Sequence, residues 1–403
     1  MTETMGQPSK VLFISTYPPV KCGIASFTQD LVQGIERELA KDIGISVCAL
    51  GSKDSAVAYK HPVSMVMDSH QLESCIETAQ AINSDASIKM VCIEHEFGLY
   101  GGEMGAFLLG FLALMEKPFI IRFHTVLGNP DPKRRVLVQK ISDLADKVVV
   151  MTQHSFTVLQ SDYKIAADKI LIIPHGTHSN SDKPVKELKL KRQLENRQVL
   201  CTFGLLSPNK GIEKGILAMK RISERFPDSI YVVVGQTHPN LIAQEGEQYR
   251  NYLQQLIVDH QLERHVRLIN DYVPTDKLME YLALTDVYLF TSRDPHQAVS
   301  GTFLYAMSAG CAIISNSFVL ASEMLTDDTG IILKTDEVDE LADNGIALLE
   351  NNAMRKRMGR AAFLKMRETS WQKVAQKHAA LLSDLMPQKY VPVTSLHSAI
   401  QLK

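Results

Sequence analysis

The segment from Asp294 to Met307 has the residues expected of an anion site at the start of a helix. Ser300 is a good N-cap, apolar helical periodicity continues through Met307, and Gly310 can close the helix. The backbone N–H groups of Ser300, Gly301 and Thr302 would then lie at the positive end of the helix, without partners inside it. Such helix starts bind phosphate, so this spacing predicts a phosphate site at Ser300–Thr302.

A lysine occupies a second predicted strand-to-helix junction, Phe203–Gly211, with Lys210 next to the start of the following helix. A cation weakens a helix start unless an anion offsets it, which predicts that Lys210 binds phosphate. A solvated lysine is the alternative reading. Gln236 and His238 follow the next predicted strand, where they could line the same site or only close a loop.

Polar residues also follow the predicted strands of the first half. Gly23 lies in a loop that opens a helix, where a phosphate could approach the backbone, although a plain turn explains a single glycine equally well. Glu94 and Glu96 flank His95 at the end of another predicted strand, and two carboxylates at such a position are costly to bury unless they have a function. His124 ends the next strand. Adjacent residues of a strand point to opposite faces, which disfavours joint ligation of one metal ion. These strand ends predict a shared polar site.

Short β-branched runs alternate with stretches of helical periodicity, which is typical of βαβ units and a parallel sheet. The pattern occurs twice along the chain. The first series predicts strands at Val11–Ser15, Gly44–Leu50, Met90–Glu94, Phe119–Phe123, Lys147–Met151 and Ile170–Pro174, with helices such as Ile24–Leu39 and Lys133–Ala145. The second predicts strands at Val199–Phe203, Ile230–Val234, Val266–Leu268, Val287–Phe290 and Ala312–Ser315, with helices near Ile212–Arg225, Gln248–His260 and Lys277–Leu284.

The polar segment Ser179–Arg197 separates the two series and is the predicted domain boundary. We therefore expect an N-terminal Rossmann-like domain over residues 1–185, a C-terminal one over residues 186–385, and a tail over residues 386–403. Helices are predicted at Asp336–Glu350, Met354–Glu368 and Trp371–Leu385, and a return of the last helix to the first domain is left open. The fold class is thus α/β, with two doubly wound parallel sheets.

Composition and charge exclude several classes of protein. The chain has 403 residues, of which 45% are apolar and 22% charged, and a net charge of −2, which gives no general attraction to nucleic acid or an anionic membrane. The apolar stretch Gly105–Met115 is too short to span a bilayer, and Met1–Lys10 lacks a signal-peptide core. These two absences predict a cytoplasmic protein. Six scattered cysteines predict reduced thiols and no structural zinc, and the lack of an Asp-x-Asp pair predicts no catalytic metal site.

Taken in order from Val11 to Trp371, these segments resemble the retaining glycosyltransferases of family 4, which have the GT-B fold of two Rossmann-like domains facing a cleft. The resemblance implies that Gly23 faces the donor phosphates and acceptor, and that His124 lies near the donor sugar. It implies that Lys210 clamps the diphosphate above the helix start at Ser300, Gly301 and Thr302. Glu96, His95, Gln236 and His238 are expected to contact substrate.

This chain departs from the family pattern at three positions. Leu205 stands where most relatives carry an arginine, and Gln297 and Tyr305 stand at the two ends of a segment that usually bears two glutamates. Gln297 can still hydrogen-bond sugar hydroxyls, whereas Tyr305 cannot accept two ribose hydroxyls as a carboxylate does. We expect Gln297 to act with His124 and Lys210 in catalysis, and Tyr305 to line the donor site.

The expected reaction moves a hexosyl group from a UDP-, GDP- or ADP-sugar to a carbohydrate or another hydroxyl acceptor, with retention and without a cofactor or metal. Two alternatives stay open. A phosphorylase or a transferase that uses a sugar 1-phosphate would tolerate Leu205 and Tyr305. A non-catalytic subunit would bind sugar or a partner enzyme. The residue types also leave homo-oligomerisation open.

Overall fold

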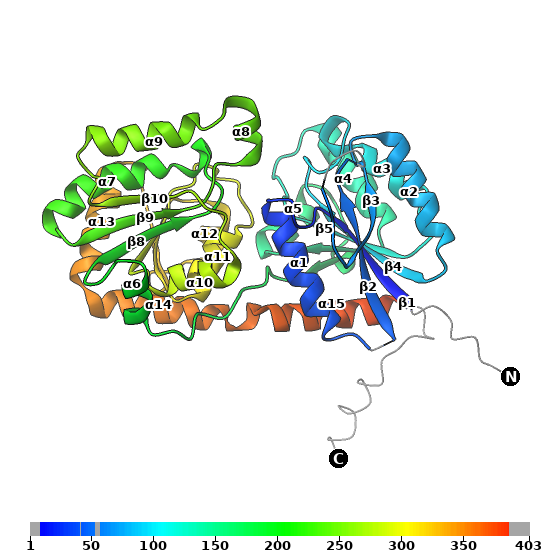
Figure 1. Cartoon of the computed structure of the whole chain (residues 1–403). Coiled ribbons are helices and arrows are strands. Elements are labelled where there is room, and N and C mark those ends of the chain that lie inside the picture. The colour runs from blue at the N-terminus through cyan, green and yellow to red at the C-terminus, as the bar shows by residue number, and fades with distance from the viewer. Residues whose placement is uncertain (1–8, 41, 53–56, 387–403) are drawn as a thin grey trace, which may run out of the picture. The chain divides into compact units, whose positions relative to one another are not determined.

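The structure is a computed structural model that describes residues 9–40, 42–52 and 57–386. Its contacts divide the chain into two compact units (Figure 1). Unit 1 contains the described residues up to Gly176 and those from Trp371 onward, and unit 2 is Thr177–Ser370. Each unit has its own parallel sheet and its own buried core.

The sheet of unit 1 has the strand order β3-β2-β1-β4-β5-β6-β7, and every pair of neighbouring strands is parallel. Its strands are β1 (Ser9–Ser15), β2 (Ile43–Leu50), β3 (Val63–Met67), β4 (Ile88–His95), β5 (Phe119–Phe123), β6 (Lys147–Val150) and β7 (Ile170–Ile172). Its helices are α1 (Gly23–Glu36), α2 (Leu72–Ser84), α3 (Phe107–Ala113), α4 (Pro132–Leu144), α5 (Gln153–Ser161) and α15 (Trp371–Leu385), with short 3-10 turns at η1 (Glu103–Gly105) and η2 (Ala167–Lys169).

The sheet of unit 2 has the order β10-β9-β8-β11-β12-β13, again with parallel neighbours. Its strands are β8 (Gln198–Phe203), β9 (Ser229–Val234), β10 (Val266–Ile269), β11 (Val287–Phe290), β12 (Ala312–Ser315) and β13 (Ile331–Ile332). Its helices are α6 (Val185–Lys191), α7 (Ile212–Arg225), α8 (Pro239–Glu245), α9 (Gln248–Asp259), α10 (Thr275–Ala283), α11 (Gly301–Ser308), α12 (Val319–Met324), α13 (Val338–Glu350) and α14 (Asn352–Lys365), with 3-10 turns at η3 (Pro208–Lys210) and η4 (Met366–Thr369).

The predicted α/β class with two doubly wound parallel sheets is confirmed. Every strand that the sequence predicts is present, with ends that differ by a few residues at most. Two strands were not predicted, and both lie at a sheet edge. β3 is only partly buried and so lacks a continuous apolar run, and β13 has two residues, too few for a periodic signal.

The boundary between the units lies after Gly176, upstream of the expected boundary between residues 185 and 186. The polar segment that follows belongs to unit 2, because Leu188 of α6 is fully buried in its core and Arg192 forms an ion pair with Glu280 at 2.6 Å. Helix α15 belongs to unit 1, where it lies along α1 (Figure 1). Apart from Met386, the expected tail lies outside the described residues.

The core of each unit combines the apolar side chains of its strands with those of the helices that cover the sheet. In unit 1 Leu12, Ile14, Val91 and Ile121 are all under 1% exposed. Within the described ranges, no helix is both long and apolar enough to cross a bilayer.

Candidate functional site

Each sheet has one point where the strand order reverses. In unit 1 the reversal lies between β1 and β4, and in unit 2 between β8 and β11. Ligands of doubly wound sheets bind beyond the carboxyl ends of the strands at this point, because the helices that follow the two strands lie on opposite faces and leave a crevice. The segments containing Gly23 and Glu96 follow β1 and β4, and those containing Lys210 and Ser300 follow β8 and β11.

The two loops at the reversal of unit 2 are tied together by hydrogen bonds. The Thr291 hydroxyl donates to the backbone oxygen of Lys210 at 2.8 Å, and the Arg293 N–H donates to the backbone oxygen of Asn209 at 2.8 Å. Gly211 has a φ of 59°, and a Cβ there would lie 2.4 Å from the Thr291 oxygen, so only glycine allows this approach. Lys210 is therefore held in place by its main chain.

The Lys210 side chain is half-buried, and no hydrogen bond or ion pair joins its Nζ to any other residue that the structure describes. Burial lowers the pKa of Lys210, an effect that the negative charge of Asp294 partly offsets. Burial lowers the pKa of His238, and the positive charge of Lys210 lowers it further. These two predicted site residues therefore interact electrostatically. An unpaired, desolvated ammonium group is suited to an anionic ligand.

Helix α11 begins as the sequence predicts. Ser300 is its N-cap, and the Ser300 hydroxyl accepts from the Phe303 N–H at 3.4 Å and lies 3.1 Å from the Thr302 hydroxyl. The N–H groups of Gly301 and Thr302 occupy the first turn, where no intrahelical acceptor exists. A Cβ on Gly204, which follows β8, would lie 3.2 Å from the Thr302 methyl, so the start of α11 adjoins the loop that carries Lys210.

Gln236 and His238 lie in the loop after β9, which pairs with the loop after β8. The backbone N–H of Leu206 donates to the backbone oxygen of Gln236 at 2.8 Å, and the backbone N–H of His238 donates to the backbone oxygen of Leu206 at 2.9 Å. The His238 ring also caps α8 by accepting from the Asn240 N–H at 3.2 Å. Lys210, Gln236 and His238 are thus brought into one group of loops, with His238 also serving as a helix cap.

Gly235 makes this pairing of loops possible, and its replacement should be severely destabilising. Its φ is 153°, and a Cβ at this position would lie 1.9 Å from the Gly204 carbonyl oxygen. Gly235→Ala should therefore lower the free energy of unfolding by about 3 kcal/mol or more. Gly246→Ala is the control, because Gly246 has a φ of 65° and open space around it, and it should cost about 1 kcal/mol. Equal losses in urea denaturation would contradict this account.

Gln297 and Tyr305 have different surroundings. Gln297 is half-buried, and its backbone oxygen accepts from the Leu320 N–H at 3.3 Å. The Tyr305 ring is stacked with Phe203, with centroids 6.4 Å apart, and meets His178 edge-on at 5.0 Å. Tyr305 is therefore part of the aromatic packing at the end of β8.

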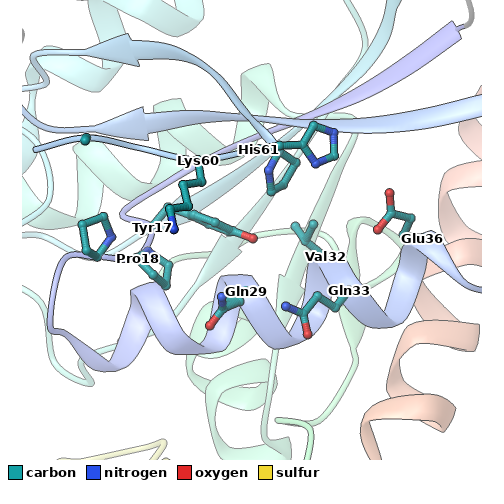
Figure 2. A pocket seen from close by; sticks show the side chains of 11 residues that line it. Tyr17, Pro18, Gln29, Val32, Gln33, Glu36, Lys60 and His61 are labelled. Carbon is teal, nitrogen blue, oxygen red and sulfur yellow. The ribbon is translucent and has the colours of Figure 1, made fainter. Parts of the chain in front are cut away.

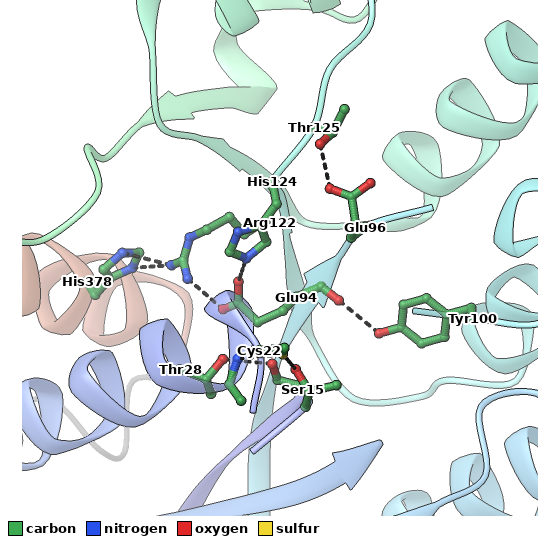
Figure 3. Close-up of polar contacts among 12 residues, drawn as sticks. Ser15, Cys22, Thr28, Glu94, Glu96, Tyr100, Arg122, His124, Thr125 and His378 are labelled. Carbon is green, nitrogen blue, oxygen red and sulfur yellow. Dashed lines mark hydrogen bonds and ion pairs between the residues drawn. The ribbon is translucent and has the colours of Figure 1, made fainter. Parts of the chain in front are cut away.

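In unit 1, a buried ionic network holds His124 (Figure 3). The Glu94 carboxylate accepts from Arg122 Nη1 at 2.5 Å and from His124 Nε2 at 2.7 Å. On its other side Arg122 donates to the His378 ring, 2.8 Å from Nε2. His378 comes from α15, so the returning helix completes the network. Glu94, Arg122 and His378 are each at most 2% exposed.

The network fixes the charges of its members. Burial raises the pKa of Glu94, but Arg122 and His124 together outweigh it and the pKa lies below its ordinary value, so Glu94 is ionised. Burial and the adjacent Arg122 charge hold the pKa of His378 well below its ordinary value, so its ring is neutral and can accept the Arg122 N–H. Glu94 thereby orients the His124 ring and sets which nitrogen carries the proton.

The other predicted residues of unit 1 surround the ends of β1, β4 and β5. Gly23 is the exposed first residue of α1, and the preceding Cys22 caps the helix through its Sγ, which accepts from the Ala25 N–H at 3.2 Å. Glu96 accepts from the Thr125 hydroxyl at 2.5 Å. Gly23, Glu96 and His124 therefore follow adjacent strands at the reversal of this sheet.

His95 does not reach this polar edge, contrary to its expected contact with substrate. Its side chain is fully buried against Phe97, Tyr100 and Phe123, because residue 95 faces the side of the sheet opposite to Glu94. Neither ring nitrogen has a hydrogen-bond partner among the described residues. A ligand beyond the end of β4 would meet Glu96 instead.

Two buried neutral histidines should make stability fall in mild acid. Burial lowers the pKa of His95 to about 3, and that of His378 lies well below its ordinary value. Below about pH 6.5 the unfolded chain binds protons that these folded rings do not, so stability is lost as the pH falls. From about pH 6.5 to 5.5 the two rings should together remove about 2 kcal/mol.

Urea denaturation at the two pH values measures this loss. His95→Phe should remove about half of it, because phenylalanine fills a similar volume without a proton to bind, and should not lower stability near neutral pH. A pH dependence that is the same in His95→Phe and in the unchanged protein would contradict the assignment.

Sequence reasoning placed Glu94 in the polar group at the end of its strand without giving it a role, and it did not assign Arg122 or His378 to the site. One signal was available for the first two: a glutamate and an arginine interrupt strands whose other buried residues are mostly apolar. Glu94 and Arg122 are direct neighbours in the β4–β5 register. His378 carried no local signal, because its role depends on where α15 lies.

Comparison with known proteins agrees with this architecture. Residues 185–365, nearly all of unit 2, match the family model for glycosyl transferases group 1. A D-inositol 3-phosphate glycosyltransferase of Corynebacterium glutamicum is 24% identical over 274 residues, which are 66% of this chain and 63% of that protein. The matched region thus spans less than two thirds of that relative's length.

Solved structures share the two-unit fold over almost the whole chain. The Anabaena HepE protein, solved in complex with UDP and glucose, superposes with a TM-score of 0.71 at 17% identity and covers 94% of this chain and 100% of its own. The sucrose-phosphate synthase of Thermosynechococcus elongatus has a TM-score of 0.74 at 14% identity, over 94% and 99% of the two chains. The chain therefore has the GT-B fold, and its unit 2 is similar to the domain that the family model for glycosyl transferases group 1 describes.

Proposed function

We propose that the protein is a glycosyltransferase that moves a hexosyl group from a nucleotide-diphosphate sugar to a carbohydrate or another hydroxyl acceptor, with retention. One observation carries this proposal: Lys210 is unpaired among the described residues, half-buried, and anchored through its backbone to the loop that leads to Ser300. The family match of unit 2 and the UDP and glucose named for the Anabaena protein support a nucleotide-sugar donor.

In the proposed reaction the bond between the sugar and the diphosphate breaks, and negative charge grows on the leaving phosphate. Lys210 and the N–H groups of Gly301 and Thr302 would stabilise that charge, because they are fixed before the reaction begins. The acceptor oxygen would form the new bond to the same sugar carbon, on the face that the phosphate leaves, and its proton would pass to the leaving phosphate, so that no protein nucleophile is needed. In unit 2, Gln297 would bind sugar hydroxyls. In unit 1, the ring of His124, which Glu94 orients, offers a further group for hydrogen bonds to hydroxyls.

The test is a thermal-shift and turnover screen of the purified protein against UDP-, GDP- and ADP-sugars. A donor at about 100 times its Kd should add about 2.7 kcal/mol of stability, and its sugar should be released or transferred. Cleavage of an oligosaccharide that depends on inorganic phosphate, without a nucleotide, would instead assign a phosphorylase. No stabilisation by any sugar nucleotide or sugar phosphate, together with a stable partner protein in pull-downs, would assign a non-catalytic subunit.

A further inference from the structure

A pocket of about 460 Å³, with both polar and apolar lining residues, lies in unit 1, apart from the Glu94–His124 network (Figure 2). One wall is α1, and the other is the segment before β3 that contains Lys60 and His61. Tyr17, from the loop after β1, lies between them. Its volume falls within the range of small-molecule sites, which is about 300–1,000 Å³.

The side chains that line this pocket are available to a ligand. Gln29, Gln33 and Glu36 lie at spacings of four and three residues, so they share one face of α1 and project into the pocket (Figure 2). None of these three, nor Lys60 or His61, has a side-chain hydrogen bond or ion pair with another residue in the described part of the chain. Together they present both donors and acceptors.

The charges of the pocket favour a neutral ligand. Lys60 is balanced by Glu36, and the negative charges of Glu36 and Asp30 both act on Tyr17. Burial and these two carboxylates raise the pKa of Tyr17 to about 12, so its phenol remains a hydrogen-bond donor. Among the residues that line the pocket, the single carboxylate of Glu36 offsets the single lysine, Lys60, so a phosphate or a nucleotide would gain no net charge attraction there.

The other residues that line the pocket have small apolar side chains, and they include Pro18, Pro19, Pro62 and Val32. Such walls suit the C–H faces of a sugar ring, whose hydroxyl groups both donate and accept hydrogen bonds. An apolar ligand would leave the two glutamine amides and the carboxylate without partners.

We propose that this pocket binds a neutral carbohydrate, as a subsite of unit 1 for the acceptor glycan. The proposal rests on the proposed function only for the choice of a carbohydrate as the acceptor class. The pocket would hold part of the glycan that does not react, through Gln29, Gln33 and Glu36 on one side and Lys60 and His61 on the other.

Titration calorimetry with maltotetraose, cellotetraose and mannotetraose tests the proposal, with UDP and inorganic phosphate as anionic probes. At least one tetrasaccharide should bind, and the double variant Gln33→Ala/Glu36→Ala should raise its Kd about tenfold or more, because two hydrogen-bonding groups are lost. Both residues are exposed, so the fold should not suffer. Glu77→Ala/Gln80→Ala is the matched control, because these residues are exposed on α2 outside the pocket, and its Kd should not change.

The proposal is overturned if no tetrasaccharide binds the unchanged protein at about 10 mM, or if the pocket variant binds as tightly as the control. Lys210→Ala separates this proposal from the proposed function, since it should retain tetrasaccharide binding while losing donor turnover. The protein could bind a tetrasaccharide, lose that binding in the pocket variant, and still turn over no donor. That result would support the pocket and contradict glycosyl transfer.

Discussion

Replacing Lys210 with alanine should lower kcat/KM for the nucleotide sugar by about 10²–10³-fold and leave the fold intact. The expected loss is large because the Lys210 ammonium is half-buried, without a partner among the residues described, and held by Thr291 through its backbone, so that it need not reorganise as charge develops on the leaving phosphate. Steady-state kinetics with the donor found by the screen measures the loss, and the thermal midpoint checks the fold.

Lys220→Ala is the matched control for this substitution. Lys220 is exposed on α7 in the same unit, so its removal should change neither kcat/KM nor the thermal midpoint. If Lys210→Ala and Lys220→Ala retain the same activity, Lys210 does not stabilise the leaving group.

The pH profile gives an independent check on the same residue. Because burial lowers the pKa of Lys210, activity should decline with rising pH earlier than an ordinary lysine would cause. Arginine stays protonated throughout this range, so Lys210→Arg should keep part of the activity and lose this decline. An unchanged alkaline decline in Lys210→Arg would assign it to another group.

The second large effect is expected at Glu94. Glu94→Gln leaves the buried Arg122 guanidinium without a carboxylate partner, and breaking a buried pair in this way costs about 3–5 kcal/mol. Glutamine keeps one acceptor oxygen and has an NH2 donor in place of the other, so it can accept from Arg122 or from His124 but not from both through separate oxygens. The orientation of the His124 ring is therefore weakened, and kcat should also fall. Urea denaturation and donor kinetics on the same preparation measure both effects.

Glu103→Gln is the control, since Glu103 pairs with Lys133 on the surface of the same unit, where both side chains are more than 60% exposed. Water and salt screen such a pair, so its loss should leave the unfolding midpoint and the activity nearly unchanged. Equal midpoints for Glu94→Gln and Glu103→Gln would mean that the buried network does not stabilise unit 1.

Features that depend on neighbouring residues could be read from the sequence. Alternating strand and helix periodicities predicted both sheets, and Ser300 predicted the start of α11, because periodicity and capping are local properties. The positions of His124 directly after a strand and of Lys210 just before the following helix follow from the same pattern. The role of each as a donor or sugar ligand remains a prediction.

Features that depend on packing between distant segments required the tertiary structure. The sequence shows Glu94 and His95 side by side, but the β4–β5 register pairs Glu94 with Arg122, and only the faces of the folded sheet decide that His95 is buried. The return of α15 brings His378 to Arg122 across 256 positions of the chain. The sequence by itself thus determined the two sheets and the polar ends of their strands, because these depend on local patterns. Burial, strand register and the return of α15 determined which charges are paired, because those pairs join segments far apart in the chain.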